Sequence, residues 1–339
     1  MKLPSSGRTL LIQPLPGIGD MVWHLPHIHA LARTTVDGQI DVLAKPRSRA
    51  DQLLGADSSV RRILWLERDP DPGPHSGWPG IIRLAALLRS GGYHRVWLLH
   101  DSARYALVTW LAGIAERFGY GFGAQQLWLQ KPGLPSDYRY HHPIKKANAL
   151  LDLYSIARIP GDEKLYLDMR TRQEIANRFA QLTKSWIALG IGSSESWKQW
   201  GEANFVALAG EINRRGWGLP ILIGGGPREA LLAAQIEAQV RAIGGRILNG
   251  VDLTVAETIA LMSYARLYIG NDTGFLNVAA ALGINALGLF GSSPPLSYSP
   301  FIHVISPENG QECDYHSRNM AGISVAVVVQ RAAHLLASA

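Results

Sequence analysis

The chain has 339 residues, of which 47% are hydrophobic and 18% charged, and it contains one cysteine. A chain of this length folds as about two domains, and a single cysteine excludes a small secreted scaffold held together by disulfides. The longest apolar runs fall far short of the ~20 residues that cross a bilayer. The N-terminus has no long apolar segment followed by a cleavage site, so we predict a cytoplasmic protein.

The net charge of +6 is distributed unevenly. Residues 1–168 carry +5, with 20 Lys and Arg against 15 Asp and Glu, whereas residues 169–339 carry +1. This excess fits either a solvated basic face or an acidic partner, such as a phosphorylated or carboxylated substrate or an anionic membrane surface. We predict no nucleic-acid partner, because no basic helix, zinc spacing or aromatic RNA-binding motif accompanies the charge.

Short apolar runs alternate with amphipathic segments along the chain. The runs predict buried strands of parallel sheets at residues 10–13, 40–44, 95–99, 186–191, 220–223, 266–269 and 286–290. The segments between them predict helices at about 21–34, 80–91, 103–115, 145–157, 171–184, 202–215, 228–243, 255–264 and 273–282. This βαβ order is typical of an α/β fold.

The strand and helix pattern starts afresh after a strand predicted before Asp168 and a polar helix that follows it. We therefore place a domain boundary near residues 168–172. A last helix, predicted from Val325 to about Leu336 with Ser324 as its N-cap, is apolar on most of its circumference and must pack on another element. Two stretches predict mainly loop, residues 69–80 and 292–322.

The turn after the first predicted strand contains Gly17, Gly19 and Asp20. Open α/β sheets bind ligands beyond the carboxyl ends of their strands. Two glycines allow a tight turn that brings Asp20 to this rim, at the start of a helix. Asp20 is either a helix N-cap or a carboxylate beside a ligand, and the local sequence leaves both open.

A second turn follows the strand at 186–191 and contains Gly192, Ser193, Ser194 and, further on, Lys198. Backbone amides, two hydroxyls and one mobile positive charge suit a phosphate. The third glycine of a dinucleotide fingerprint is missing, and so is the Gly-Lys-Ser or Gly-Lys-Thr of a Walker loop. The segment is either another kind of phosphate loop or a surface loop with packed aromatic residues.

Two more turns lie in the second half. Residues 224–226 are glycines that permit close approach of a ligand, and Glu229 can accept hydrogen bonds from a ribose or simply favour the first turn of its own helix. Asp272, Thr273 and Gly274 open a helix whose free amides form an anion site, unless Asp272 only caps the helix. Three such turns on one predicted sheet edge fit a nucleoside diphosphate.

In these residues the chain resembles glycosyltransferase family 9, the ADP-heptose:lipopolysaccharide heptosyltransferases. The likeness is strongest over residues 10–31 and 186–291, and its most specific part is the run of residues 265–291, which includes Asn271-Asp272-Thr273-Gly274. It implies a GT-B architecture, in which two Rossmann-like domains with parallel sheets face each other across a cleft. Residues 1–170 would bind the acceptor, residues 171–322 would bind the nucleotide sugar, and a C-terminal helix at 323–339 would pack back on the first domain.

The resemblance also implies roles for individual residues. Asp20 would be the catalytic base that removes the proton of the acceptor hydroxyl, and Lys198 would stabilise the departing diphosphate. The implied donor-binding residues are Ser193, Ser194, Lys198, Glu229, Asp272, Thr273 and Gly274. The predicted acceptor-binding residues are Gly19, His24, Lys45 and Arg47.

The function predicted on this basis is inverting transfer of a sugar without a metal ion. The donor would be a nucleotide sugar such as ADP-heptose, and the acceptor an anionic glycan or glycolipid such as lipopolysaccharide core, reached at the cytoplasmic face of the inner membrane. No cofactor is predicted, because residues 69–71 fit a proline-rich turn and Cys313 with His316 are too few for zinc. The pair His141 and His142 fits either acceptor contacts or a solvated loop.

Two positions depart from the family pattern. Family members commonly have a histidine where Asn277 stands and often a basic residue where Gln13 stands. Asn277 cannot carry a charge, so any contact that it makes to a phosphate would differ. Two alternatives therefore stay open, a catalytically silent protein that binds a nucleotide sugar and a GT-B-like sugar epimerase. A nucleotide-dependent oxidoreductase is disfavoured by the missing dinucleotide fingerprint.

Overall fold

The structure is a computed structural model that describes residues 7–68, 72–179, 186–193, 195–225, 227–308, 310 and 313–337. It divides into two compact units, the first ending at Leu165 and the second starting at Tyr166. The sequence analysis placed this boundary near residues 168–172, a few residues later in the chain than the structure does. Among the described residues, no helix has both the length and the apolar character needed to span a bilayer.

The first unit contains a five-stranded parallel sheet in the order β3-β2-β1-β4-β5. Its strands are β1 (Arg8–Gln13), β2 (Ile40–Ala44), β3 (Val60–Trp65), β4 (Tyr93–Leu98) and β5 (Glu116–Gly119). Its helices are α1 (Ile18–Val22), α2 (Leu25–Ala32), α3 (Ala50–Leu54), α4 (Gly77–Ser90), α5 (Ala103–Leu111) and α6 (Pro143–Leu153). Short 3-10 turns are η1 (Pro46–Ser48), η2 (Gly123–Trp128) and η3 (Ser136–Tyr140).

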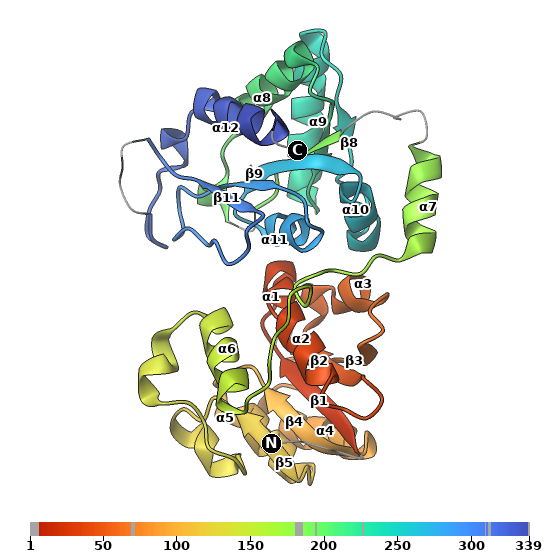
Figure 1. Ribbon diagram of the computed structural model, residues 1–339, viewed down its shortest axis with the longest axis vertical. Helices are drawn as coiled ribbons and strands as arrows, with labels where there is room; N and C mark the ends of the chain where they lie inside the picture. The colour runs from red at the N-terminus through yellow and green to blue at the C-terminus, as the bar shows by residue number, and fades with distance from the viewer. Residues whose placement is uncertain are drawn as a thin grey trace. The chain divides into compact units, whose positions relative to one another are not determined.

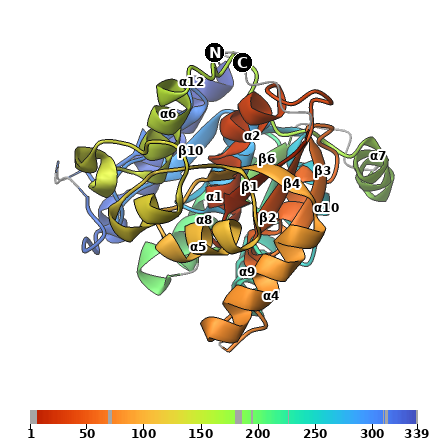
Figure 2. The ribbon, with the colours of Figure 1, turned by 90° about the horizontal axis from the view of Figure 1, so that it is seen from below.

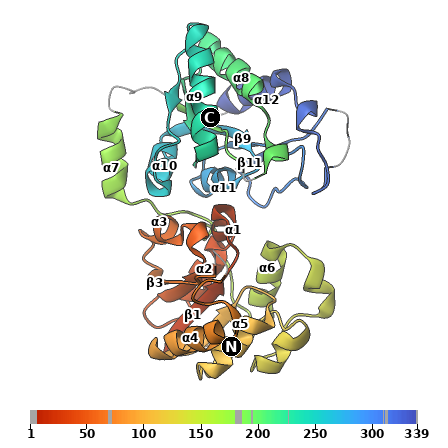
Figure 3. The same ribbon diagram turned by 180° about the vertical axis from the view of Figure 1, so that it is seen from behind.

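Helices α4 and α5 pack side by side on one face of this sheet (Figures 2 and 3). Leu84 of α4 and Val108 of α5 share an apolar cluster with Ile12 of β1. Trp97, which points to the other face of β4, stacks on Phe118 of β5 with ring centroids 4.2 Å apart. Because both faces are covered, the central strands are almost continuously apolar, as parallel strands usually are.

The second unit contains a six-stranded parallel sheet in the order β11-β10-β9-β6-β7-β8. Its strands are β6 (Trp186–Gly190), β7 (Leu219–Ile223), β8 (Leu248–Asn249), β9 (Ala265–Asn271), β10 (Ala286–Leu289) and β11 (Ile302–Ile305). Its helices are α7 (Met169–Arg178), α8 (Glu202–Arg215), α9 (Pro227–Ala242), α10 (Val255–Met262), α11 (Gly274–Ala281) and α12 (Val325–Ala337). The 3-10 turns η4 (Ser196–Lys198) and η5 (Met320–Gly322) complete it.

Alternate residues of the second sheet enter two different cores, as the period of a strand requires. Ile187 and Leu222 join the cluster that covers α8 and α9, whereas Trp186 and Ile221 join the cluster that covers α7 and α10. The last helix, α12, lies beside α8 (Figure 1) and adds buried residues such as Val328 to the first of these cores. Its packing on the N-terminal domain, which the resemblance implied, stays a prediction.

Seven of the strands expected from the sequence are the inner strands of the two sheets. The four that the sequence did not predict, β3, β5, β8 and β11, are the edge strands. An edge strand has one neighbour and is often short or charged, which protects it from pairing with other chains. Its apolar signal is therefore weak: β3 carries Arg61 and Arg62, β8 has two residues, and β11 lies in a stretch that the sequence predicted to be mostly loop.

Three further expectations were wrong in detail. The single helix expected at residues 21–34 is two helices, α1 and α2, because Pro26 stands at the start of α2 and proline cannot lie inside a helix without losing a hydrogen bond. Helix α4 begins at Gly77, inside the stretch expected to be a loop. Residues 164–168 form no strand, and Asp168 caps α7 by accepting hydrogen bonds from the amides of Arg170 and Thr171.

Candidate active-site residues at two sheet edges

The carboxylate of Asp20 lies in the turn that follows β1. Gly17 is the N-cap of α1, and its amide donates to Asp20 Oδ2 at 2.8 Å. A β-carbon at position 17 would lie 2.9 Å from this oxygen, so a side chain there would displace the Asp20 carboxylate. Burial raises the pKa of Asp20, while the Gly17 amide and the nearby His142 and Arg47 act to lower it. Asp20 is therefore not the N-cap but a partly buried carboxylate on the first turn.

Two buried side chains hold the main chain of Asp20. Gln13 Nε2 donates to the carbonyl oxygen of Asp20 at 3.0 Å, and His24 Nδ1 lies 2.6 Å from the same oxygen. Since a carbonyl only accepts, Nδ1 of His24 carries the proton. Burial lowers the pKa of His24 to about 4, although the bond to Asp20 opposes this shift, so the ring is neutral near pH 7. His24, which was expected to bind the acceptor, is fully buried, and it holds the main chain of Asp20.

Other side chains reach the same sheet edge from neighbouring strands. Lys45 and Arg47 follow β2. Arg47 belongs to η1, of which Lys45 is the N-cap, and η1 lies beside α1. Arg47 is exposed and Lys45 is half-buried. His142, at the start of α6, packs edge-on against Trp23 with ring centroids 4.7 Å apart, and its ring nitrogen accepts a hydrogen bond from the amide of Ile144. Burial lowers the pKa of His142, and the charge of Asp20 opposes that shift.

An ion pair beyond β4 was not anticipated from the sequence. Lys146 of α6 donates to Asp101 at 2.9 Å and is almost buried, with its ammonium 5.3 Å from the ring centre of Tyr120. Burial alone would raise the pKa of Asp101, but the hydrogen bond and charge of Lys146 bring it below the usual value. Burial also lowers the pKa of the adjacent His100. This edge thus combines several cations with two carboxylates, Asp20 and Asp101.

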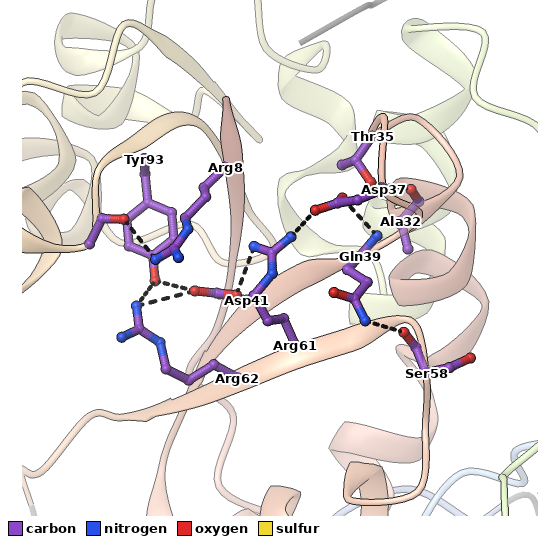
Figure 4. Close-up of polar contacts among 11 residues, drawn as sticks. Arg8, Ala32, Thr35, Asp37, Gln39, Asp41, Ser58, Arg61, Arg62 and Tyr93 are labelled. Atoms are coloured by element: carbon purple, nitrogen blue, oxygen red, sulfur yellow. Dashed lines mark hydrogen bonds and ion pairs between the residues drawn. The ribbon is translucent and has the colours of Figure 1, made fainter. Parts of the chain in front are cut away.

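A further buried carboxylate, Asp41, lies near the amino end of β2 and is fully paired (Figure 4). Tyr93 donates to its Oδ2 at 2.7 Å, and Arg62 contacts the same oxygen at 3.2 Å. Arg61 approaches the other oxygen at 3.4 Å. Because ligands bind beyond the carboxyl ends of parallel strands, this cluster at the opposite ends of the strands has a structural role.

In the second unit, Lys198 stands in η4, after β6. Its ammonium lies 2.8 Å from Glu195 Oε2, and its side chain is 18% exposed. Ser193 belongs to the same turn: its hydroxyl donates to the carbonyl oxygen of Glu195 and accepts from the Glu195 amide. Ser194 lies outside the described residues. The lysine is therefore held in place by a carboxylate that the sequence did not single out.

Asp272 and Thr273 follow β9, as expected, and α11 begins at Gly274. Thr273 is the N-cap of this helix, so Asp272 is not a cap. Asp272 instead accepts a hydrogen bond of 2.7 Å from Ser293. Burial raises the pKa of Asp272. The hydrogen bond with Ser293 and the charge of Lys198 act to lower this pKa, whereas the charge of Glu195 raises it further. The side chain thus orders the loop after β10 beside the first turn of α11.

Glu229, on the first turn of α9, lies against the two glycine turns. A β-carbon on Gly192 would be 3.5 Å from Glu229 Cγ, and one on Gly224 would be 3.1 Å from Glu229 Cβ. The structure therefore brings the turns after β6 and β7 together around one carboxylate. The ribose-binding role expected of Glu229 stays a prediction. Gly226 lies outside the described residues.

Asn271 links these turns and was not identified as a site residue. It is fully buried at the end of β9. Its Nδ2 donates to the carbonyl oxygens of Ile191 and Gly192 and to Gln199, each at 3.1 Å, and its Oδ1 accepts from the amide of Trp200. Its position directly before Asp272 was a possible signal, but its partners lie about 70 to 80 residues earlier and only the fold reveals them.

The departure at Asn277 has a structural explanation. The side chain is buried on α11, where Nδ2 donates to the carbonyl oxygen of Thr273 and Oδ1 accepts from the Tyr298 hydroxyl at 2.9 Å. Among the described residues, no group of three or more His, Cys, Asp and Glu side chains is arranged to hold a metal ion. Cys313, the one cysteine of the chain, is buried and forms no disulfide. Residues 69–71, interpreted above as a proline-rich turn, lie outside the described residues.

Comparison with known proteins gives concordant results. The model of glycosyltransferase family 9 (heptosyltransferase) matches residues 81–316. Lipopolysaccharide heptosyltransferase 3 of Escherichia coli is 21% identical over 301 residues, which cover 84% of this chain and 83% of that protein.

Solved structures share the fold over the whole chain. The E. coli ADP-heptose lipopolysaccharide heptosyltransferase II superposes with a TM-score of 0.77 at 20% identity, covering 98% of this chain and 99% of that one. A family 9 glycosyl transferase from Veillonella parvula DSM 2008 gives 0.79 at 17% identity, covering 100% and 99%. The expected GT-B class, with two parallel sheets of Rossmann type, is thereby confirmed.

Proposed function

The chain belongs to glycosyltransferase family 9 and is a glycosyltransferase, and from this premise we propose that it moves heptose from ADP-heptose to a lipopolysaccharide-core acceptor with inversion and without a metal ion. The observation that carries the proposal is Asp20. It is a partly buried carboxylate at the carboxyl edge of a parallel sheet, fixed at one oxygen and flanked by basic side chains. The donor and acceptor follow the names of the similar enzymes.

On the acceptor side, Asp20 acts as the general base. Its pKa is raised by burial, which makes the carboxylate a stronger base than an exposed aspartate. The Gly17 amide occupies Oδ2, so Oδ1 is the oxygen that would accept the proton of the acceptor hydroxyl. Gln13 and His24 position Asp20 through its carbonyl oxygen. The hydroxyl then attacks the anomeric carbon opposite the departing diphosphate, which inverts that centre.

On the donor side, positive charge and amides stabilise the departing diphosphate. Lys198 would exchange its contact with Glu195 for a phosphate oxygen, and the amides of Thr273 and Gly274 would bind another at the start of α11. Asp272 contributes by ordering Ser293. We assign Ser193 and Ser194 to the same diphosphate loop and Glu229 to the ribose. These groups take the place of a metal ion in neutralising the leaving group.

The acceptor is proposed to be anionic. Lys45 and Arg47 stand beside Asp20 at the sheet edge, and Gly19 forms part of the turn that supports it. These cations attract phosphate or carboxylate groups on the glycan. Such an acceptor is lipid-linked, so we propose that the enzyme works at the cytoplasmic face of the inner membrane.

The test is transfer with purified components. We expect the chain to convert ADP-heptose and a heptose-deficient core acceptor to a product one heptose heavier by mass spectrometry, with an inverted anomeric centre by NMR and undiminished rates in EDTA. UDP- and GDP-sugars should not replace the donor. Absence of both transfer and ADP release would identify a silent binding protein instead, and isomerised sugar without acceptor would identify an epimerase.

A further inference from the structure

The outer surface of the first unit carries exposed apolar side chains on three neighbouring elements, α4, α5 and η2. Trp78 of α4 is 73% exposed, Ile82 is 60% exposed, and Leu127 of η2 is 77% exposed. Trp110 of α5 is about half exposed and lies against Trp128 with ring centroids 5.0 Å apart. A cluster of this kind is uncommon on a monomer and marks an interaction surface.

The arrangement follows from the way these elements pack. One side of α4 is buried in the core of the unit through residues such as Leu84 and Leu88. Trp78 and Ile82 stand one turn apart on α4, and both side chains are exposed to solvent. Helix α5 packs beside α4 (Figures 2 and 3), and η2 packs beside α5. We name the exposed surface of these three neighbouring elements the α4–α5 face.

The charge of this face has one sign. Helices α4 and α5 and the turn η2 contain three arginines, Arg83, Arg89 and Arg104, and no aspartate or glutamate. The three guanidinium groups donate to backbone carbonyl oxygens such as those of Pro74, Leu111 and His75. Within the described part of the chain, no carboxylate forms an ion pair with any of them, so their positive charge is not neutralised.

We propose that the α4–α5 face binds the surface of an anionic lipid bilayer. Tryptophan and aliphatic side chains enter the boundary between headgroups and acyl chains, while arginines beside them extend to the lipid phosphates. A second copy of the chain fits less well, since a two-fold contact would bring two sets of arginines into one interface without a carboxylate from α4, α5 or η2 to pair with them. This inference rests on the proposed function in one respect: a lipid-linked acceptor gives the enzyme a reason to bind a membrane.

The experiment is co-sedimentation of the full chain with vesicles, without donor or acceptor. We expect binding to vesicles of phosphatidylglycerol and phosphatidylethanolamine, weaker binding in high salt, and little binding to phosphatidylcholine alone. Trp78→Ser with Ile82→Ser should weaken partitioning at least about tenfold. Arg83→Gln with Arg89→Gln should weaken it about 25-fold, from ~1 kcal/mol per arginine.

Exposure-matched controls are available on the second unit. Leu231 and Ile243 are 65% and 64% exposed, and their change to serine should leave vesicle binding unchanged. Arg170→Gln with Arg241→Gln controls for the loss of two charges. Thermal melting of each variant verifies that it folds, and transfer to a delipidated, soluble acceptor should stay at the wild-type rate in the Trp78 and Ile82 variant.

Three outcomes would overturn the proposal. The first is that the wild-type chain does not sediment with anionic vesicles. The second is that both α4 variants bind vesicles as well as the wild type, and the third is that the control variants lose as much vesicle binding as the α4 variants. Because vesicle binding needs no substrate, a chain that binds lipid but transfers no sugar refutes the proposed function alone, and one that transfers sugar but ignores vesicles refutes this inference alone.

Discussion

Asp20 in the first unit and Asp272 in the second invite comparison, because both follow an inner strand of a parallel sheet and both have a pKa raised by burial. Their neighbours differ. Asp20 accepts from a backbone amide and has only basic side chains, His142 and Arg47, as charged neighbours that shift its pKa. Asp272 accepts from the Ser293 hydroxyl and lies near both Lys198 and Glu195. Burial thus raises the basicity of both carboxylates. Only their neighbours distinguish Asp20, the proposed proton acceptor, from Asp272, which orders a loop.

The largest expected effect follows from removing the base. Asp20→Asn keeps the shape of the turn but cannot accept a proton, so kcat/KM should fall by about 10³ to 10⁴. ADP affinity, measured by calorimetry, should stay within about twofold. Asp272→Asn serves as the matched control and should lose far less activity. Equal losses in the two variants would abolish the distinction between the carboxylates.

Removal of the positive charge in the second unit comes next. Lys198→Ala should lower kcat about 10²-fold, because charge on the departing diphosphate loses its stabilisation. The same change should weaken ADP binding, unlike Asp20→Asn, which separates the roles of the two units. Arg318, which stacks on Trp197 of the same turn, gives a control: Arg318→Gln should leave ADP binding near that of the wild type. Wild-type kinetics in the Lys198 variant would contradict the assignment.

A stability effect is expected at Asn271. Asn271→Ala leaves the buried amide of Trp200 and the carbonyl oxygens of Ile191 and Gly192 without their partner, which should cost about 2–4 kcal/mol of unfolding free energy. Urea denaturation followed by circular dichroism measures it. ADP affinity should fall as well, because the turn after β6 loosens. Asn204→Ala, which removes a single bond at a partly buried site, should cost about 1 kcal/mol and provides the control.

The smallest effect concerns pH. Transfer requires ionised Asp20, so kcat/KM should fall as the pH drops through its pKa, which lies above that of an ordinary aspartate. Arg47 acts to lower this pKa, so Arg47→Gln should move the acidic limb to higher pH. Arg170→Gln, on exposed α7, should leave it in place. His24, whose pKa is about 4, stays neutral near pH 7 and does not titrate there. A limb that Arg47→Gln leaves unmoved would show that another group titrates.

The accuracy of the sequence analysis depended on burial. Strands such as β1 and β6 were predicted because both of their faces are covered, which requires a continuous apolar run. The edge strand β3 was not predicted, because Arg61 and Arg62 interrupt its run of apolar residues. In the structure both arginines pair with Asp41. The break between α1 and α2 had a local signal in Pro26, which the helical period concealed.

For the candidate site, glycine-rich turns after strands located Asp20, Lys198 and Asp272, since a ligand needs open backbone at the carboxyl edge of a sheet. The sequence could not say which role each side chain takes. His24 was expected to meet the acceptor and is fully buried against the Asp20 carbonyl. Glu195, which the sequence analysis did not select, contacts Lys198.

The sequence by itself determined the fold class, the order of inner strands and helices, and the turns in which chemistry can occur, because these depend on apolar period and on residues near one another in the chain. Tertiary structure decided the sheet edges, the contacts of Asn271 with residues far earlier in the chain, and the separate environments of Asp20 and Asp272. The physical reason is that pKa and hydrogen bonding depend on which groups meet in space, and those groups come from different strands.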